Sequence, residues 1–116
     1  MRKVFLIVAV LFFLMFTCLA IAHPPTDIIF KYDAKGKILS VGVAHSAKDF
    51  KKHFIKEIKI EVNGQDWIVQ DFLSQPTLDV QAASYAQVDL KKGDIIEILV
   101  VCNQAGQLSK KFKIEK

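Results

Sequence analysis

The chain has 116 residues, and its 16 basic against 12 acidic residues give a formal net charge of +4. This length suits one small domain. Beyond Lys3 every basic residue is a lysine. Because phosphate and nucleic-acid recognition depends heavily on the planar arginine fork, a mild lysine excess without arginine argues against a nucleic acid as partner.

The N-terminus has the pattern of an export signal. Arg2 and Lys3 form a charged start, and residues 4–22 are apolar apart from Thr17. Ala20-Ile21-Ala22 then supplies small residues at the two positions that a signal peptidase reads. We therefore predict a signal peptide at residues 1–22, a domain at residues 23–116, and an exported protein in the periplasm or outside the cell.

Two other readings of the N-terminus stay open. The apolar run of residues 4–22 is close to the roughly 20 residues that span a bilayer, so an uncleaved membrane anchor is an alternative. A lipoprotein attached through Cys18 is less favoured, because Met15-Phe16-Thr17 lacks the small residue expected before a lipidated cysteine. Cleavage after Ala22 would make His23 the first residue of the mature chain.

After residue 22 the hydrophobic pattern has the period of β-strands. Ile58, Ile60 and Val62 alternate with charged residues, which is typical of a strand buried on one face. Asn63-Gly64 predicts a tight hairpin turn, since both residues tolerate positive φ. The predicted strands are residues 27–32, 38–44, 58–62, 67–72, 80–90, 95–102 and 108–114. About seven short strands separated by turns predict an all-β fold, an immunoglobulin-like antiparallel β-sandwich.

The segment between His45 and His53 has neither strand nor helix periodicity, so we predict a loop with a histidine at each end. Binding sites are common on loops that a rigid scaffold holds. Cys102 closes the most apolar predicted strand, and it is the only cysteine after residue 22. Its structural interpretation is a small buried hydrophobe; its functional interpretation is a metal ligand or a reactive thiol.

These residues carry a resemblance to a known family. The run from His45 through His53-Phe54-Ile55 into the strand before Asn63-Gly64 resembles the iron-binding domain of desulfoferrodoxin and the superoxide reductases. The closing Cys102-Asn103-Gln104-Ala105-Gly106 resembles that family's Cys-Asn-x-His-Gly loop. The resemblance implies an immunoglobulin-like sandwich, which agrees with the fold that the periodicity predicts.

In that family, histidines and an axial cysteine thiolate hold one ferrous ion that reduces superoxide to hydrogen peroxide. The resemblance therefore implies iron (Fe²⁺) as cofactor, superoxide as substrate, and a separate electron donor. Matched residue by residue, it implies that Cys102, His53 and His45 are metal ligands and adds His23 as the family's early histidine. Ala105 stands at the position of the family's last histidine ligand, so the ligand set is incomplete and copper or zinc is an alternative to iron.

Two functions of other classes compete with a superoxide-reductase-like enzyme. The first is a non-catalytic copper-binding module, in which cleavage would give His23 a free α-amine beside its imidazole, a chelating pair that copper favours. The second is a metal-free interaction domain that kept the fold. No serine nucleophile motif and no glycine-rich phosphate loop occurs in the sequence.

Overall fold

The computed structural model describes residues 2–15 and 23–115. These described residues contain one helix and seven strands. They are α1 Arg2–Met15, β1 Asp27–Asp33, β2 Ile38–Ala44, β3 Ile55–Val62, β4 Gln65–Asp71, β5 Val80–Tyr85, β6 Ile95–Cys102 and β7 Gln107–Lys113. The predicted cleavage point after Ala22 lies outside the described residues. Within those residues, no helix combines the length and hydrophobicity needed to cross a bilayer.

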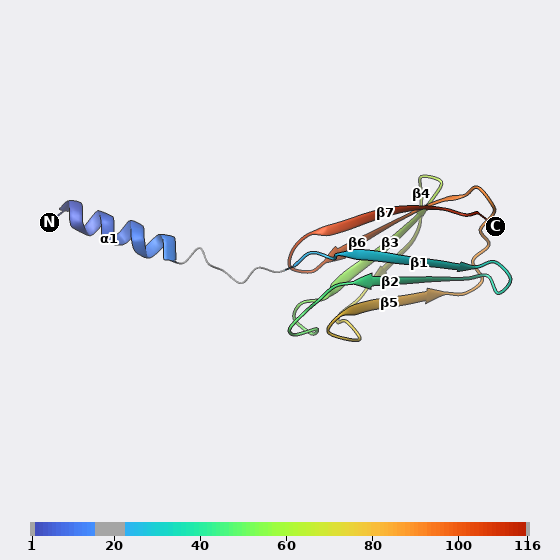
Figure 1. Cartoon of the computed structure of the whole chain (residues 1–116), viewed down its shortest axis with the longest axis horizontal. Coiled ribbons are helices and arrows are strands. Elements are labelled where there is room, and N and C mark those ends of the chain that lie inside the picture. Colours follow the sequence, from blue (N-terminus) through green and yellow to red (C-terminus); the bar gives the residue numbers. More distant parts are fainter. Residues whose placement is uncertain (1, 16–22, 116) are drawn as a thin grey trace.

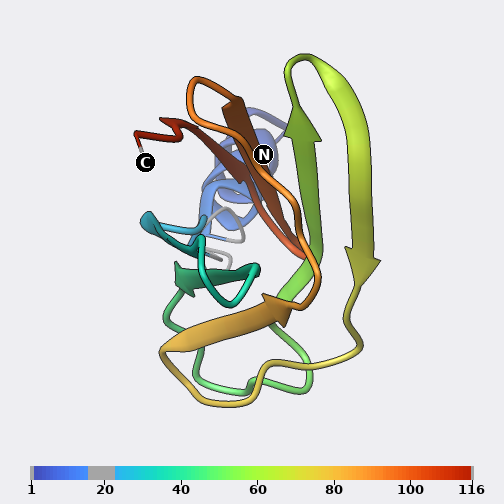
Figure 2. The same ribbon diagram turned by 90° about the vertical axis from the view of Figure 1, so that its right-hand side faces the viewer.

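The strands form two antiparallel sheets that pack as two layers (Figure 1, Figure 2). One sheet has three strands in the order β1-β2-β5, and the other has four in the order β4-β3-β6-β7. The predicted all-β sandwich of seven strands is confirmed. At the predicted hairpin, Asn63 and Gly64 both have positive φ, 52° and 82°, so this turn joins β3 to β4 as expected.

Two predicted strand boundaries are wrong by three residues or more, and the others agree to within two residues. Strand β3 begins at Ile55 rather than at residue 58, because pairing with β6 extends it to the Ile55–Cys102 pair. Strand β5 ends at Tyr85, whereas the prediction continued to residue 90. Gln87 has a φ of 57°, which takes the chain out of the extended conformation and ends the ladder. Val88 and Leu90 remain buried, so their apolar character reflects the core and not a strand.

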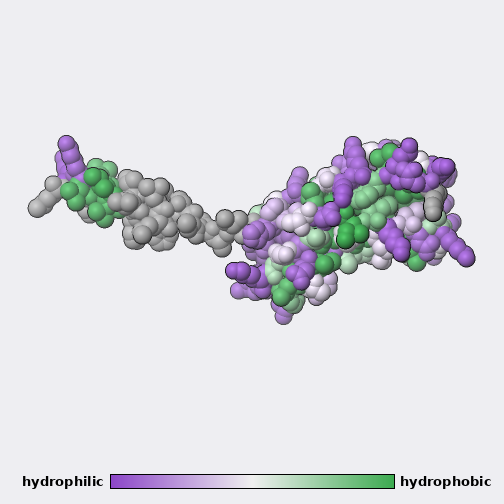
Figure 3. Space-filling view, in the orientation of Figure 1, coloured by the Kyte–Doolittle hydropathy of each residue, from purple (hydrophilic) through white to green (hydrophobic). Residues whose placement is uncertain are grey.

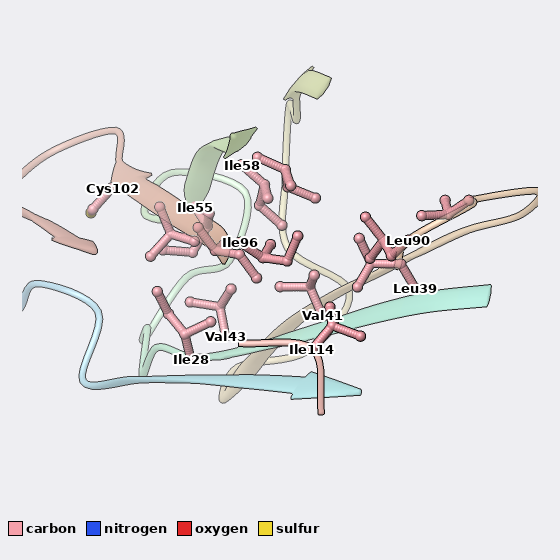
Figure 4. Packing of buried hydrophobic residues seen from close by; sticks show 14 residues of the cluster. Ile28, Leu39, Val41, Val43, Ile55, Ile58, Leu90, Ile96, Cys102 and Ile114 are labelled. Atoms are coloured by element: carbon pink, nitrogen blue, oxygen red, sulfur yellow. The ribbon is translucent and has the colours of Figure 1, made fainter. Parts of the chain in front are cut away.

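Alternate residues of the central strands fill the space between the sheets. The buried hydrophobic cluster comprises Ile28, Leu39, Val41, Val43, Ile55, Ile58, Ile60, Val88, Leu90, Ile96, Ile98, Val100, Cys102 and Ile114. Cys102 lies at one end of this cluster, far from Leu39, Leu90 and Ile114 (Figure 4). The face of the domain seen in Figure 3 carries hydrophilic residues, with apolar side chains exposed between them.

Strands β1 and β7, from different sheets, are joined at the edge of the sandwich. The rings of Phe30 and Phe112 stack with centroids 4.7 Å apart. The Lys110 ammonium donates to the Asp27 carboxylate at 2.9 Å. This hydrogen bond, followed by one from the Ile28 backbone N–H and by the charge of Lys110, lowers the pKa of Asp27 below 3.8.

We expect the Asp27–Lys110 pair to make folding stability depend on pH at the acidic end. Because the folded pKa is lower than the unfolded pKa, the unfolded state binds more protons as the pH falls. The contribution is therefore present above the unfolded pKa and is lost as the pH falls through the folded value, below 3.8. Acid-unfolding curves should show a weaker pH dependence in this window for Asp27→Asn. The matched control is Asp89→Asn. It removes a carboxylate whose oxygen lies 3.8 Å from the Lys37 ammonium.

Candidate metal centre

The loop between β2 and β3 meets the distant end of β6 at the end of the sandwich where β1 begins. His45 follows the last residue of β2, His53 lies two positions before the start of β3, and Cys102 is the last residue of β6. Ile55 at the start of β3 pairs with Cys102 at the end of β6. This pairing brings His53, just before β3, beside Cys102. The ligand atoms of His45, His53 and Cys102 all lie within 4.8 Å of one another.

The closest contact in this group joins His53 Nε2 to Cys102 Sγ, at 3.0 Å. The rings of His45 and His53 meet edge to face, with centroids 4.6 Å apart and an interplanar angle of 87°. His45 and Cys102 are buried, at 1% and 4% exposure, and His53 is partly exposed. The group therefore has two buried members and one that borders the solvent.

Asn103 holds the segment around His53 against the end of β6. Its carbonyl Oδ1 accepts the Phe54 backbone N–H at 2.9 Å, and its backbone N–H donates to Phe54 O at 3.0 Å. Its side-chain amide also donates to Lys52 O at 2.9 Å. Both neighbours of His53 are thus anchored to Asn103. The Gln104 backbone N–H points at the Cys102 sulfur at 3.5 Å.

His45 is held on both sides of its ring. Nδ1 lies 2.8 Å from the Gln75 side-chain oxygen, and Nε2 lies 3.1 Å from the His23 backbone oxygen. Gln75 is itself buried, at 1% exposure. The predicted strands end at residue 72 and resume at residue 80, so Gln75 falls between them with no role assigned. Nothing local in the sequence distinguishes a buried glutamine from an exposed one, so Gln75 was missed.

The electrostatic surroundings favour a neutral His53. Desolvation lowers its pKa most, and the nearby charge of His45 lowers it further, while the His23 backbone carbonyl acts in the opposite direction. A neutral imidazole keeps a lone pair on one ring nitrogen, which is the form that binds metal ions.

His23 reaches this end of the sandwich through its backbone. Its side chain is exposed and is not part of the three-residue group, whereas its carbonyl oxygen faces His45. The next residue, Pro24, packs against the turn after Cys102, where a Cβ added to Gly106 would lie 2.6 Å from the Pro24 Cβ. Gly106 also has a φ of 78°, which favours glycine. Ala105 lies in the same turn and offers no ligand atom.

One distance in the group, which is also that of a hydrogen bond from a ring N–H to sulfur, is compatible with a shared metal ion. With metal–sulfur and metal–nitrogen bonds of about 2.3 and 2.1 Å, two ligands at a right angle are about 3.1 Å apart, and two at a tetrahedral angle are about 3.6 Å apart. The 3.0 Å separation of Cys102 Sγ and His53 Nε2 matches the right angle. Right angles are typical of six-coordinate sites, and a thiolate with imidazoles suits a transition metal.

Comparisons with known proteins show the fold. No family model matches the chain, and no curated protein matches it. A hypothetical protein from Pyrococcus horikoshii OT3 is structurally similar, with a TM-score of 0.56 and 19% identity over 88% of this chain and 99% of that chain. A superoxide reductase, solved in its oxidized state, has a TM-score of 0.55 and 15% identity over 84% and 94%. The chain has a superoxide-reductase-like β-sandwich fold. At these identities the likeness shows the fold alone.

Proposed function

We propose that this protein is an exported, superoxide-reductase-like protein that binds one ferrous ion through Cys102, His53 and His45. The observation that carries the proposal is the convergence of one thiol and two imidazoles at one end of this particular fold. One thiolate and two imidazoles suit a transition metal, and the resemblance of the sequence to an iron-binding family supports iron over zinc. The N-terminal charge and hydrophobicity pattern supports export.

Each residue has a distinct role in this proposal. Cys102 provides an anionic soft ligand from the end of the apolar core, where the Gln104 N–H stabilises the thiolate. His53 and His45 provide neutral nitrogen ligands, and Asn103 holds the loop that carries His53. When bound, ferrous iron would supply the one electron that, with two protons, converts superoxide to hydrogen peroxide. A separate one-electron donor must then restore the reduced state.

The metal content of the protein tests this function. The full chain should be isolated from the compartment in which it accumulates, without chelators or affinity metals. We expect near-stoichiometric iron and consumption of superoxide with formation of hydrogen peroxide. We also expect His23 as the first residue of the isolated protein. A protein that retains no metal after loading with iron, copper or zinc would contradict the proposal and favour a metal-free interaction domain.

Copper binding is the second candidate, and one contact favours it. The His23 carbonyl lies 3.1 Å from His45 Nε2, so the segment that would carry a new N-terminus passes directly beside the three-residue group. After cleavage, the α-amine and imidazole of His23 would form a chelating pair. Stoichiometric copper that is lost in His23→Ala, with iron absent, would support this candidate against the iron protein.

A further inference from the structure

Gln75 is a buried glutamine with partners for all of its amide hydrogen-bonding groups. It lies in the loop between β4 and β5, at 1% exposure. Its Oε1 is 2.8 Å from His45 Nδ1 and accepts the Ile55 N–H at 3.3 Å. Its Nε2 donates to His45 O and to Thr77 O, both at 2.9 Å. One side chain therefore connects the end of β2, the start of β3 and the loop before β5.

These partners determine which way the amide points. Nε2 faces two carbonyl oxygens, which only accept hydrogen bonds, and Oε1 faces a backbone N–H, which only donates. Exchanging the two atoms would place an oxygen against two carbonyls, so the orientation is fixed by the network. Oε1 is an acceptor, and His45 Nδ1 must therefore carry the proton in their 2.8 Å contact.

The other ring nitrogen follows once His45 is neutral, which is the form that a metal ligand takes. A neutral imidazole has one N–H, so a proton on Nδ1 leaves a lone pair on Nε2. Yet Nε2 lies 3.1 Å from the His23 carbonyl oxygen, which is also an acceptor. Two lone pairs at this distance repel each other, so this position calls for a positive charge: either a second proton, which would donate to the carbonyl, or a metal ion, for which the carbonyl must move aside. His45 is 1% exposed, so water has little access to separate them.

We propose that Gln75 is a positioning residue of this metal centre. It keeps the proton of His45 on Nδ1 and so presents Nε2, with its lone pair, as the ligand atom. Histidine ligands in metal sites usually donate their second ring N–H to a protein acceptor, which sets the tautomer and orients the ring. This inference rests on the proposed metal binding. The inference adds Gln75 to the proposed metal centre as a residue that acts through His45 and is not itself a metal ligand.

The tautomer is measured first, in metal-free wild-type protein. The ¹⁵N chemical shifts of the histidine rings, at a slightly alkaline pH, distinguish a protonated nitrogen from one with a lone pair. We expect His45 to have its proton on Nδ1, and Gln75→Met to lose this preference. A proton on Nε2, or on both nitrogens, in the wild-type protein would overturn the proposal. This measurement needs no bound metal, so it stands apart from the proposed function.

Metal affinity is measured second, by titration with ferrous iron alone under anaerobic conditions. We expect Gln75→Met to weaken binding about 10- to 100-fold, as is typical when the partner of a histidine ligand is removed. Gln75→Glu keeps an acceptor opposite Nδ1, so it should retain the proton on Nδ1. It also places an oxygen against His45 O and Thr77 O, so it should lose folding stability. Unchanged affinity in Gln75→Met would overturn the role of Gln75. Failure of the wild-type protein to bind any metal would instead overturn the proposed function.

The chain provides a matched control in Gln81. It is also buried, at 3% exposure, and its amide nitrogen donates to Ala82 O with no contact to the three-residue group. Gln81→Met should leave both the His45 tautomer and the iron affinity unchanged. An equal loss of affinity in Gln81→Met and Gln75→Met would show a general effect of replacing a buried glutamine, and would overturn a specific role of Gln75. If Gln75→Met does not fold, the tautomer of His45 in the wild-type protein still decides.

Discussion

Cys102→Ala will weaken iron binding by at least about 100-fold, because the loss of a direct thiolate ligand exceeds the usual effect of removing an outer partner. The thiolate is the only anionic member of the three-residue group, and its sulfur lies 3.0 Å from His53 Nε2. The two histidines that remain offer neutral nitrogens, which hold a transition metal less tightly than a set with a soft anionic ligand. Anaerobic titration with ferrous iron measures the change.

A spectroscopic readout accompanies the titration. Oxidised wild-type protein should have a sulfur-to-iron charge-transfer band, and Cys102→Ala should lack it. Val100→Ala is the matched control, because Val100 is fully buried on the same strand but has no ligand atom. It should lose folding stability and keep the band. A Cys102→Ala protein that binds iron as the wild type does would mean that Cys102 is only a small buried residue at the end of the core.

Ile60→Ala will lower the free energy of unfolding by about 2–5 kcal/mol, the usual cost of truncating a fully buried isoleucine. Ile60 is 0% exposed. It lies in the middle of β3, opposite Ile68 of β4 and Ile98 of β6. Deleting its side chain removes apolar contacts and leaves a cavity that the two neighbouring strands cannot readily close. For a domain stable by about 5–15 kcal/mol, this is a large share of the total.

Urea denaturation measures this loss as a shift of the midpoint with an unchanged slope. The control is Ile29→Ala, because Ile29 is also a strand isoleucine but is 64% exposed on β1. Substitutions at such exposed positions usually change stability by no more than about 0.5 kcal/mol. Equal effects of Ile60→Ala and Ile29→Ala would contradict the assignment of Ile60 to the inner face of its sheet.

The class of fold was readable from the sequence because strand patterns are local. Alternation at Ile58, Ile60 and Val62 marks one buried face, and Asn63-Gly64 marks a turn that needs positive φ at two successive residues. Both signals need only a few neighbouring residues. The prediction of a strand failed at residues 86–90. There, apolar residues reach the core from an irregular segment. Hydrophobic periodicity alone does not distinguish such a segment from a strand.

The candidate ligands were named from the sequence, but their meeting was decided by tertiary structure. His45, His53 and Cys102 are brought together by the pairing of β3 with β6 and by the Asn103 contacts. These are interactions between residues far apart in the chain, which no local pattern encodes. The same holds for Gln75, whose four partners come from three separate segments. It also holds for the His23 carbonyl, because a backbone oxygen leaves no trace in residue identity. The sequence by itself therefore determined the strands and the list of ligand types; packing of distant segments decided which atoms face one another.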